Sequence, residues 1–168
     1  MMIRPATPAD LSDICALHVA NWQEDYSGLL PDDVLGLPLS AEMTKRWSEL
    51  PAPPDMVFVA ERAGAFLGFG LVRPAHDDGP LLESLHVIPA ARGSGAGRAL
   101  ITRLASELGV AGYSTLWLEV LDGNQAARGF YARLGGTEST VITDHLLGRP
   151  VPARIVRWED LSVFSENA

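Results

Sequence analysis

The sequence predicts an α/β (α+β) fold in which a mixed, mostly antiparallel central sheet of about six or seven strands is flanked by about four helices. Segments with strand and helix patterns alternate along the chain instead of forming separate blocks. A glycine-rich turn joins an apolar strand to a helix start within residues 82–98. The 168 residues are 47% hydrophobic, which is enough for a single domain, residues 1–168, to bury a core.

The N-terminal half is expected to hold a short strand, two helices and three strands. Pro31 and Pro38 interrupt the stretch between the two helices. Ala63 and Gly64 provide the turn between the first two long strands. The expected elements are a strand at 3–5, a helix starting near Thr7 or Asp10, a helix at 40–50, and strands at 56–60, 65–72 and 81–88.

The C-terminal half is expected to continue with a helix that packs on the sheet, because Leu100, Leu104 and Leu108 share one of its faces. This helix forms a strand-helix-strand crossover, which makes the strands on either side of it parallel. The remaining expected elements are a strand at 115–120, a helix around Asn124, and a final strand pair at 137–143 and 153–158.

The turn at residues 92–98, RGSGAGR, has the properties of a phosphate-binding loop. Glycines remove the Cβ atoms that hold a phosphate away from the backbone, and they allow positive φ angles. The N-terminus of the following helix adds a favourable dipole. Two arginines supply donors suited to phosphate oxygens. The predicted cradle consists of Arg92, Gly93, Ser94, Gly95, Ala96, Gly97 and Arg98.

Two other phosphate-binding motifs fit this turn poorly. A P-loop ends in Gly-Lys-Ser/Thr, which is absent here. The dinucleotide motif G-x-G-x-x-G fails because its third glycine would fall on Arg98 or Leu100. Glu119 does lie about twenty residues downstream, where that motif has a ribose-binding acid. The spacing therefore argues against both a P-loop enzyme and a nucleotide-dependent oxidoreductase.

The pattern Arg92-x-x-Gly95-x-Gly97, following Leu85-His86-Val87, resembles the pyrophosphate-binding signature of the GCN5-related N-acetyltransferase (GNAT) superfamily. The run from Asn124 to Gly136, NQAARGFYARLGG, resembles that superfamily's later N-x-x-A-x-x-F-Y-x-x-x-G pattern. Gly136 stands where a phenylalanine is common, and we expect a weaker packing contact there. The two motifs span about a third of the chain. The resemblance implies the acyl-CoA N-acyltransferase fold and acetyl-CoA as cosubstrate.

The resemblance also implies how acetyl-CoA is held. The strands before and after the crossover helix splay apart, and the backbone of Leu85, His86 and Val87 pairs with the pantetheine arm. An N–H of Val87 or its neighbour, freed by a bulge, faces the thioester carbonyl. On a regular helix Asn124, Ala127 and Tyr131 share one face. Asn124 is then expected to bond the pantetheine arm and Tyr131 to protonate the departing thiolate.

Three residues are candidates for the base that accepts the amine proton. Glu83 is the first choice, because in a regular strand it shares a face with Leu85 and Val87. His86 has a suitable pKa range but points to the opposite face. Glu119 lies on the neighbouring expected strand. A water molecule bridging one of these groups to the amine is an open alternative.

The sequence says less about the residues that bind the amine acceptor. Trp22 and Tyr26 follow His18 at helical spacing, and their polar tips are expected to line the acceptor pocket. The net charge of −8 argues against nucleic-acid binding and favours a cationic acceptor. Asp25, in the same segment, is suited to attract an ammonium group. The acceptor is expected to be a small-molecule or peptide amine.

Composition bears on location and assembly. No apolar window is long enough to span a membrane, and the N-terminus lacks the pattern of a signal peptide. The lone Cys15 cannot form an internal disulfide. We therefore expect a cytoplasmic protein without membrane partners and without a metal cofactor. Exposed edge strands can pair with a second copy of the chain, so a homodimer is an open alternative.

The sequence thus predicts an acetyl-CoA-dependent N-acetyltransferase that works by direct attack of the amine in a ternary complex. Two alternatives remain open. One is a regulatory module that binds acyl-CoA without transferring it. The other is transfer of the acyl group to oxygen, or of a longer acyl chain.

Overall fold

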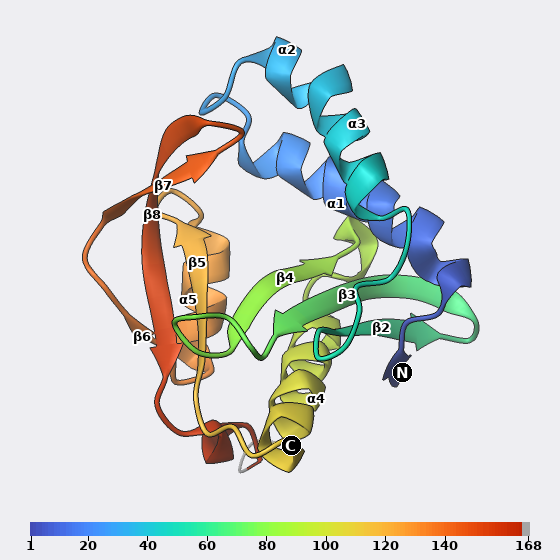
Figure 1. The fold of residues 1–168 in the computed structure, drawn as a ribbon, viewed down its shortest axis with the longest axis vertical. Coiled ribbons are helices and arrows are strands. Elements are labelled where there is room, and N and C mark those ends of the chain that lie inside the picture. The colour runs from blue at the N-terminus through green and yellow to red at the C-terminus, as the bar shows by residue number, and fades with distance from the viewer. Residues whose placement is uncertain (166–168) are drawn as a thin grey trace.

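The structure is a computed structural model that describes residues 1–165. An eight-stranded sheet has the order β1-β2-β3-β4-β5-β8-β6, and β7 pairs with β8 (Figure 1). Among the strand pairs of residues 1–165, only β4–β5 is parallel, and it is the pair joined by the crossover helix. The strands are β1 (Met2–Pro5), β2 (Met56–Arg62), β3 (Ala65–Arg73), β4 (Leu81–Val87), β5 (Leu116–Leu121), β6 (Thr137–Glu138), β7 (Ile142–Leu146) and β8 (Arg149–Trp158).

Helices cover both faces of the sheet. In residues 1–165 there are five α-helices, of which α2 is a single turn. None of these helices is long and apolar enough to cross a membrane. The α-helices are α1 (Leu11–Asp25), α2 (Asp32–Leu35), α3 (Leu37–Arg46), α4 (Ala96–Val110) and α5 (Gln125–Arg133).

Two hydrophobic clusters hold these layers together. On one face, α4 inserts Leu100, Leu104 and Leu108 against β2, β4, β5 and β8. On the other face, α1 and α3 pack Ile14 and Met43 against β2 and β3. These leucines, Ile14 and Met43 are at most 1% exposed, so the helical face predicted for residues 96–110 is confirmed.

The sheet opens between β4 and β5. The two strands share one paired position, Leu81 with Trp117, and then diverge along their length (Figure 1). Because β4 keeps its antiparallel pairing to β3 up to Val87, the edge of β4 that faces β5 is left without a neighbouring strand. This is the splay that the superfamily resemblance predicts.

Two expected boundaries were wrong. Pro31 caps α2 and Pro38 lies in the first turn of α3, so these prolines mark the starts of helices. The helix expected at 40–50 spans Leu37–Arg46 instead. The expected strand at 137–143 is split into β6 and β7. There the Ser139 hydroxyl accepts the backbone N–H of Ile155, which replaces a strand-to-strand bond.

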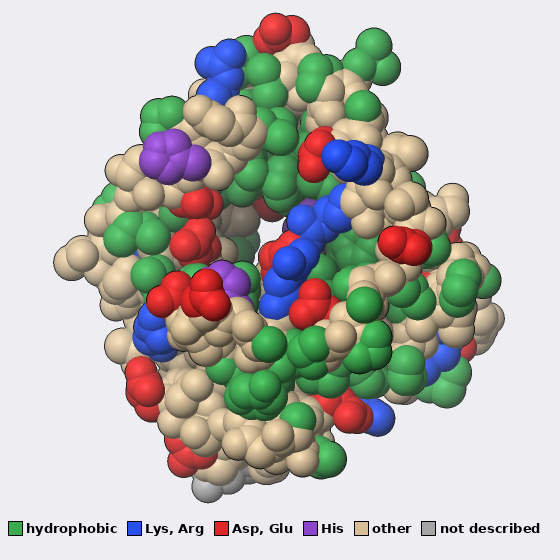
Figure 2. Space-filling view, viewed as in Figure 1, with side chains coloured by type: hydrophobic (Ala, Val, Ile, Leu, Met, Phe, Trp, Pro, Cys, Tyr) green, Lys and Arg blue, Asp and Glu red, His purple; other side chains and the backbone are tan. Residues whose placement is uncertain are grey.

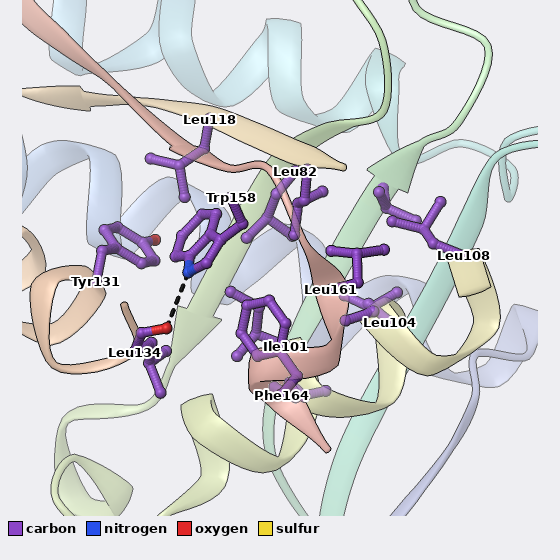
Figure 3. Packing of buried hydrophobic residues seen from close by; sticks show 14 of the residues in the cluster. Leu82, Ile101, Leu104, Leu108, Leu118, Tyr131, Leu134, Trp158, Leu161 and Phe164 are labelled. Atoms are coloured by element: carbon purple, nitrogen blue, oxygen red, sulfur yellow. Dashed lines mark hydrogen bonds between the residues drawn. The ribbon is translucent and has the colours of Figure 1, made fainter. Parts of the chain in front are cut away.

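The position of Gly136 has a different role from the one expected. A Cβ atom there would lie 2.5 Å from Val156 and 2.8 Å from Trp158. The Trp158 indole fills this space, donates Nε1–H to the Leu134 carbonyl at 2.9 Å and packs edge-on against Tyr131 (Figure 3). The expectation of a weakened contact was therefore wrong, because a tryptophan from β8 provides the packing.

Candidate functional site

A cavity of about 650 Å³ occupies the opening between β4 and β5. Its walls come from both strands, from α5, from the turn before α4 and from the C-terminal end of α1. Elements distant in sequence therefore meet at one place. Of the residues predicted to be catalytic, to bind the cofactor or to bind the acceptor, Ser94 and Trp22 do not line this cavity.

The glycine turn lies at one end of the cavity. Gly93 and Gly95 have φ angles of 77° and 88°, and a Cβ atom on either would meet nothing within 4 Å. Gly95 is the N-cap of α4, so the first backbone N–H groups of that helix have no partner within the helix. An open backbone surface at a helix N-terminus is the arrangement that binds phosphate.

Arg92 extends from this turn to α1. Its guanidinium donates to the Glu24 carboxylate at 2.9 and 2.6 Å and to Oδ1 of Asn21 at 3.4 Å. These hydrogen bonds raise the pKa of Arg92 and lower that of Glu24. The Arg92 side chain thus ties the turn to α1. Its contact with a pyrophosphate stays a prediction, as does that of Arg98, which is exposed on the cavity wall.

The free edge of β4 presents backbone groups to the cavity. The N–H of Ile88 donates to Leu67 of β3, and side chains and peptide groups alternate in direction along a strand. The N–H groups of Val87 and Leu85 therefore point away from β3, toward the gap. The bulge expected at Val87 or its neighbour is not there: Val87 pairs regularly with Gly68, and the register shifts at Glu83, opposite Leu71 and Val72.

Asn124 is the N-cap of α5 and not a residue of its first turn. Its Oδ1 accepts the backbone N–H of Ala127 at 3.0 Å, and its Nδ2 lies 3.4 Å from Oδ1 of Asp25. The premise of one regular helical face that includes Asn124 was therefore wrong, because the side chain bends back to cap the helix. Its Nδ2 is the donor that remains for a ligand.

Tyr131 lies on α5 and is 9% exposed. Its ring packs between Phe130 and Trp158, with ring centroids 5.2 and 6.0 Å away, and it also lines the cavity. Burial raises the pKa of Tyr131 above its usual value, and the negative charge of Asp25 adds to this. The phenol therefore stays protonated at neutral pH, which is the state an acid needs.

Glu83 faces the side of the sheet opposite to the one expected. Leu85 and Val87 pack against the α4 cluster, whereas Glu83 forms ion pairs with Arg46 of α3 and with Arg73. The shared-face premise was wrong because the bulge at Glu83 breaks the alternation of side chains. Glu83 still lines the cavity, but two guanidiniums hold its carboxylate.

Glu119 projects from β5 into the same cavity. Burial, followed by the charge and the side-chain hydrogen bond of Asp144 on β7, raises the pKa of Glu119 to about 7. The same cause, burial first, raises the pKa of Tyr26, with Asp144, Asp25 and Glu119 contributing. An acidic wall therefore forms from α1, β5 and β7.

Two histidines, His18 and His86, pack against each other, with ring centroids 4.7 Å apart. His18 is 1% exposed and accepts Nε1–H of Trp47 at 2.9 Å. Nδ2 of Asn21 donates to Nδ1 of His86 at 3.0 Å. Burial lowers the pKa of His86 to about 4, with Arg46 and Arg92 contributing. Burial also lowers the pKa of His18, so both imidazoles are neutral at pH 7.

The two residues predicted to line the acceptor pocket differ in their position relative to the cavity. Tyr26 lines the cavity, whereas Trp22 packs its ring between His18 and Tyr26, with centroids 5.2 and 5.3 Å away. His145, in the segment 141–150, is exposed on β7.

Sequence reasoning missed several cavity residues. Asn21 and Glu24 precede Asp25 on the last turns of α1, and all three line the cavity. The sequence feature that could have identified them is their helical spacing of i, i+3 and i+4, which puts three polar side chains on one face of the helix that contains Trp22. Arg133 also lines the cavity. Asp144 had no local signal, because β7 brings it to Glu119 from a distant part of the chain.

The glycine turn supports a direct prediction. Replacing Gly95 by alanine forces a side chain into a left-handed conformation and adds a Cβ where a phosphate approaches. We expect the affinity for CoA, measured by calorimetry, to fall at least about tenfold. Gly112→Ala is the matched control, because Gly112 also has a positive φ (90°) and open space around it, but lies beyond the far end of α4. Equal CoA affinity in the Gly95 variant and the control would contradict the cradle.

Comparisons with known proteins agree with this geometry. A family model described as "Acetyltransferase (GNAT) family" matches residues 14–136. The uncharacterized N-acetyltransferase YuaI of Bacillus subtilis is 28% identical over 126 residues, which cover 73% of this chain and 72% of that protein. The [ribosomal protein bS18]-alanine N-acetyltransferase of Escherichia coli K12 is 36% identical over 84 residues, or 50% of this chain and 56% of that protein.

A solved structure shows the same fold. The yncA protein of Salmonella typhimurium, described as a putative acetyltransferase with its cofactor acetyl-CoA, superposes with a TM-score of 0.67 at 22% identity. The match covers 96% of this chain and 94% of that one. At this identity the likeness concerns the fold alone. The family model, in contrast, covers well over half of the chain and includes both the glycine turn and the Tyr131 motif. The chain therefore belongs to the acetyltransferase (GNAT) family.

Proposed function

We propose that the protein transfers the acetyl group of acetyl-CoA to a primary amine by direct attack in a ternary complex. The observation that carries this proposal is that one cavity contains the phosphate cradle, the free edge of β4, Tyr131 and Glu119. Each of these corresponds to a need of the reaction. The curated relatives named above are N-acetyltransferases, which supports the choice of nitrogen as the acceptor atom.

The cofactor side of the cavity suits coenzyme A. The backbone N–H groups around Gly93 and Gly95 and the start of α4 would bind the pyrophosphate. The pantetheine arm would lie along β4, where the peptide groups of Leu85 and Val87 face the gap. Nδ2 of Asn124 would donate to this arm. The thioester would then reach the inner part of the cavity, beside Tyr131.

The reacting groups have complementary protonation states. Glu119, whose pKa is about 7, accepts a proton from the ammonium group or the attacking amine, directly or through water. A backbone N–H of β4, from Leu85 or Val87, stabilises the negative charge on the carbonyl oxygen. Tyr131 donates its proton to the departing thiolate.

We prefer Glu119 to the other two candidate bases. The Glu83 carboxylate is occupied by Arg46 and Arg73. The His86 imidazole, with a pKa of about 4, is a weak proton acceptor at neutral pH. Glu119 is the candidate whose pKa lies near the working pH, where a general base is most effective.

CoA release from acetyl-CoA, measured against a panel of polyamines, aminoglycosides, amino acids and peptide N-termini, tests this proposal. We expect at least one amine class to give turnover, with the acetyl group recovered on nitrogen. Tight acetyl-CoA binding without transfer to any amine would overturn it and favour the regulatory module. Transfer to a hydroxyl, or faster turnover with a longer acyl-CoA, would redirect it to those alternatives.

A further inference from the structure

Two arginines on the α3 side of the sheet have no part in the proposed reaction. Arg46 ends α3 and Arg73 ends β3, and both form ion pairs with Glu83 of β4. The only other acidic partner within 4 Å, among residues 1–165, is Asp55, which lies 3.8 Å from Nε of Arg73. A guanidinium carries more N–H donors than one carboxylate accepts, so the pair can bind a further anion.

The two guanidiniums border a second cavity of about 280 Å³. Its other walls are mostly apolar, from Trp47, Leu50 and Leu71, with Glu49 at one side. The Arg46 guanidinium also lies over the Trp47 ring, 5.6 Å from its centroid, which fixes its direction. Burial lowers the pKa of Arg46, and the charge of Arg73 adds to this. An anion placed between the arginines would relieve that repulsion.

Glu83 connects this second cavity to the reaction site. It lines the large cavity, while its carboxylate contacts the arginines that line the small one. The opposite side of the large cavity carries the acidic wall of Asp25 and Glu119. Figure 2 shows this polarity: Lys and Arg side chains follow one side of the central hollow, and Asp and Glu side chains face them from the other.

We propose that the acceptor is a free amino acid, whose carboxylate binds Arg46 and Arg73 while its amine lies toward Glu119. This rests on the proposed acetyl transfer and names the substrate class for it. Glu83 and Leu85 are two residues apart on β4, which is about 6 to 7 Å. The ion pairs of Glu83 with Arg46 and Arg73 are therefore next to the stretch of β4 along which the thioester is expected. A peptide N-terminus has a neutral amide at that distance, so the arginines favour an amino acid over a peptide.

The test compares each of the twenty standard L-amino acids with its α-carboxamide, which differs from it by the loss of the negative charge. Binding to the CoA-saturated protein is measured by calorimetry, and kcat/KM is measured with acetyl-CoA. We expect at least one amino acid to bind about ten- to a hundredfold more tightly than its amide. The same preference should appear in KM and not in kcat.

Variants test whether the two arginines cause the preference for the amino acid over its amide. Arg73→Gln should reduce the ratio of acid to amide affinity to about one, while Arg46 still neutralises Glu83. Arg73→Lys, which keeps the charge but loses the planar fork, should retain part of the ratio. Arg103→Gln removes the same charge from α4, where Arg103 pairs with Glu107, and should leave the ratio unchanged.

The outcomes separate this proposal from the one on which it rests. If no amino acid binds, if acids and amides bind alike, or if Arg73→Gln leaves the ratio intact, the amino-acid site is overturned. Acetylation of peptide N-termini or polyamines, without free amino acids, would overturn it while keeping acetyl transfer. Binding of an amino acid that depends on Arg73, without transfer to any amine, would keep the site and overturn the transferase.

Discussion

The Tyr131→Phe variant is expected to turn over about 10²- to 10³-fold more slowly than the unmodified protein, with little change in acetyl-CoA affinity. The variant removes only the hydroxyl. The ring, packed between Phe130 and Trp158, keeps its contacts, so the fold and the cavity are preserved. The loss arises because the departing thiolate has no proton donor. The raised pKa of Tyr131 means that this donor is protonated across the working pH range.

Steady-state kcat and calorimetric affinity for acetyl-CoA measure this effect. Tyr113→Phe is the matched control, because Tyr113 also packs against the α4 cluster but does not line the cavity. The control should keep its kcat. An unchanged kcat in Tyr131→Phe would remove the residue from the acid role, and an equal loss in kcat and in acetyl-CoA affinity would indicate a binding role.

Glu119→Gln is expected to lower kcat/KM by about 10²-fold or more at neutral pH. The carboxylate accepts the proton of the amine, and an amide of the same shape cannot. The sign of the pH dependence follows from the raised pKa of about 7. Below that pH Glu119 is protonated and inactive as a base, so kcat/KM of the unmodified protein should rise with pH through about 7 and then level off.

Asp144→Asn tests the cause of the raised pKa. Removing the negative charge of Asp144 lowers the pKa of Glu119, so the rising limb of the pH profile should move to lower pH. Glu83→Gln is the comparison that decides between the two carboxylates. If Glu83→Gln abolishes the limb while Glu119→Gln keeps it, Glu83 is the base and the assignment to Glu119 is wrong.

The features that could be predicted from the sequence depend on the spacing of residues that are close together in the chain. The glycines at 93, 95 and 97 mark a turn, and the spacing of Leu100, Leu104 and Leu108 marks the helix that follows it. Together they predict the crossover, whereas the splay of the two strands around it is what the resemblance to the GNAT superfamily implies. The phosphate cradle can therefore be predicted without knowing which distant residues lie near it.

The acceptor side depends on features that a single segment does not contain. A one-residue bulge, visible only in the β3–β4 register, moves Glu83 to the face of Arg46. The capping bond of Asn124 to Ala127 starts α5 one residue later than a regular helical face requires. The pairing of β7 with β8 brings Asp144 to Glu119. The bulge and the β7–β8 pairing are tertiary features that compete with local propensity, whereas the Asn124 cap is a local contact that an ideal helical face does not include.

We propose that the amine attacks acetyl-CoA directly between Glu119 and Tyr131, without an acetylated enzyme. Initial rates measured while both acetyl-CoA and an active amine are varied distinguish the two mechanisms. Direct attack gives double-reciprocal lines that intersect, since both substrates must be bound before any CoA leaves. Parallel lines, together with release of one equivalent of CoA in the absence of amine, would show an acetylated enzyme and rule out direct attack.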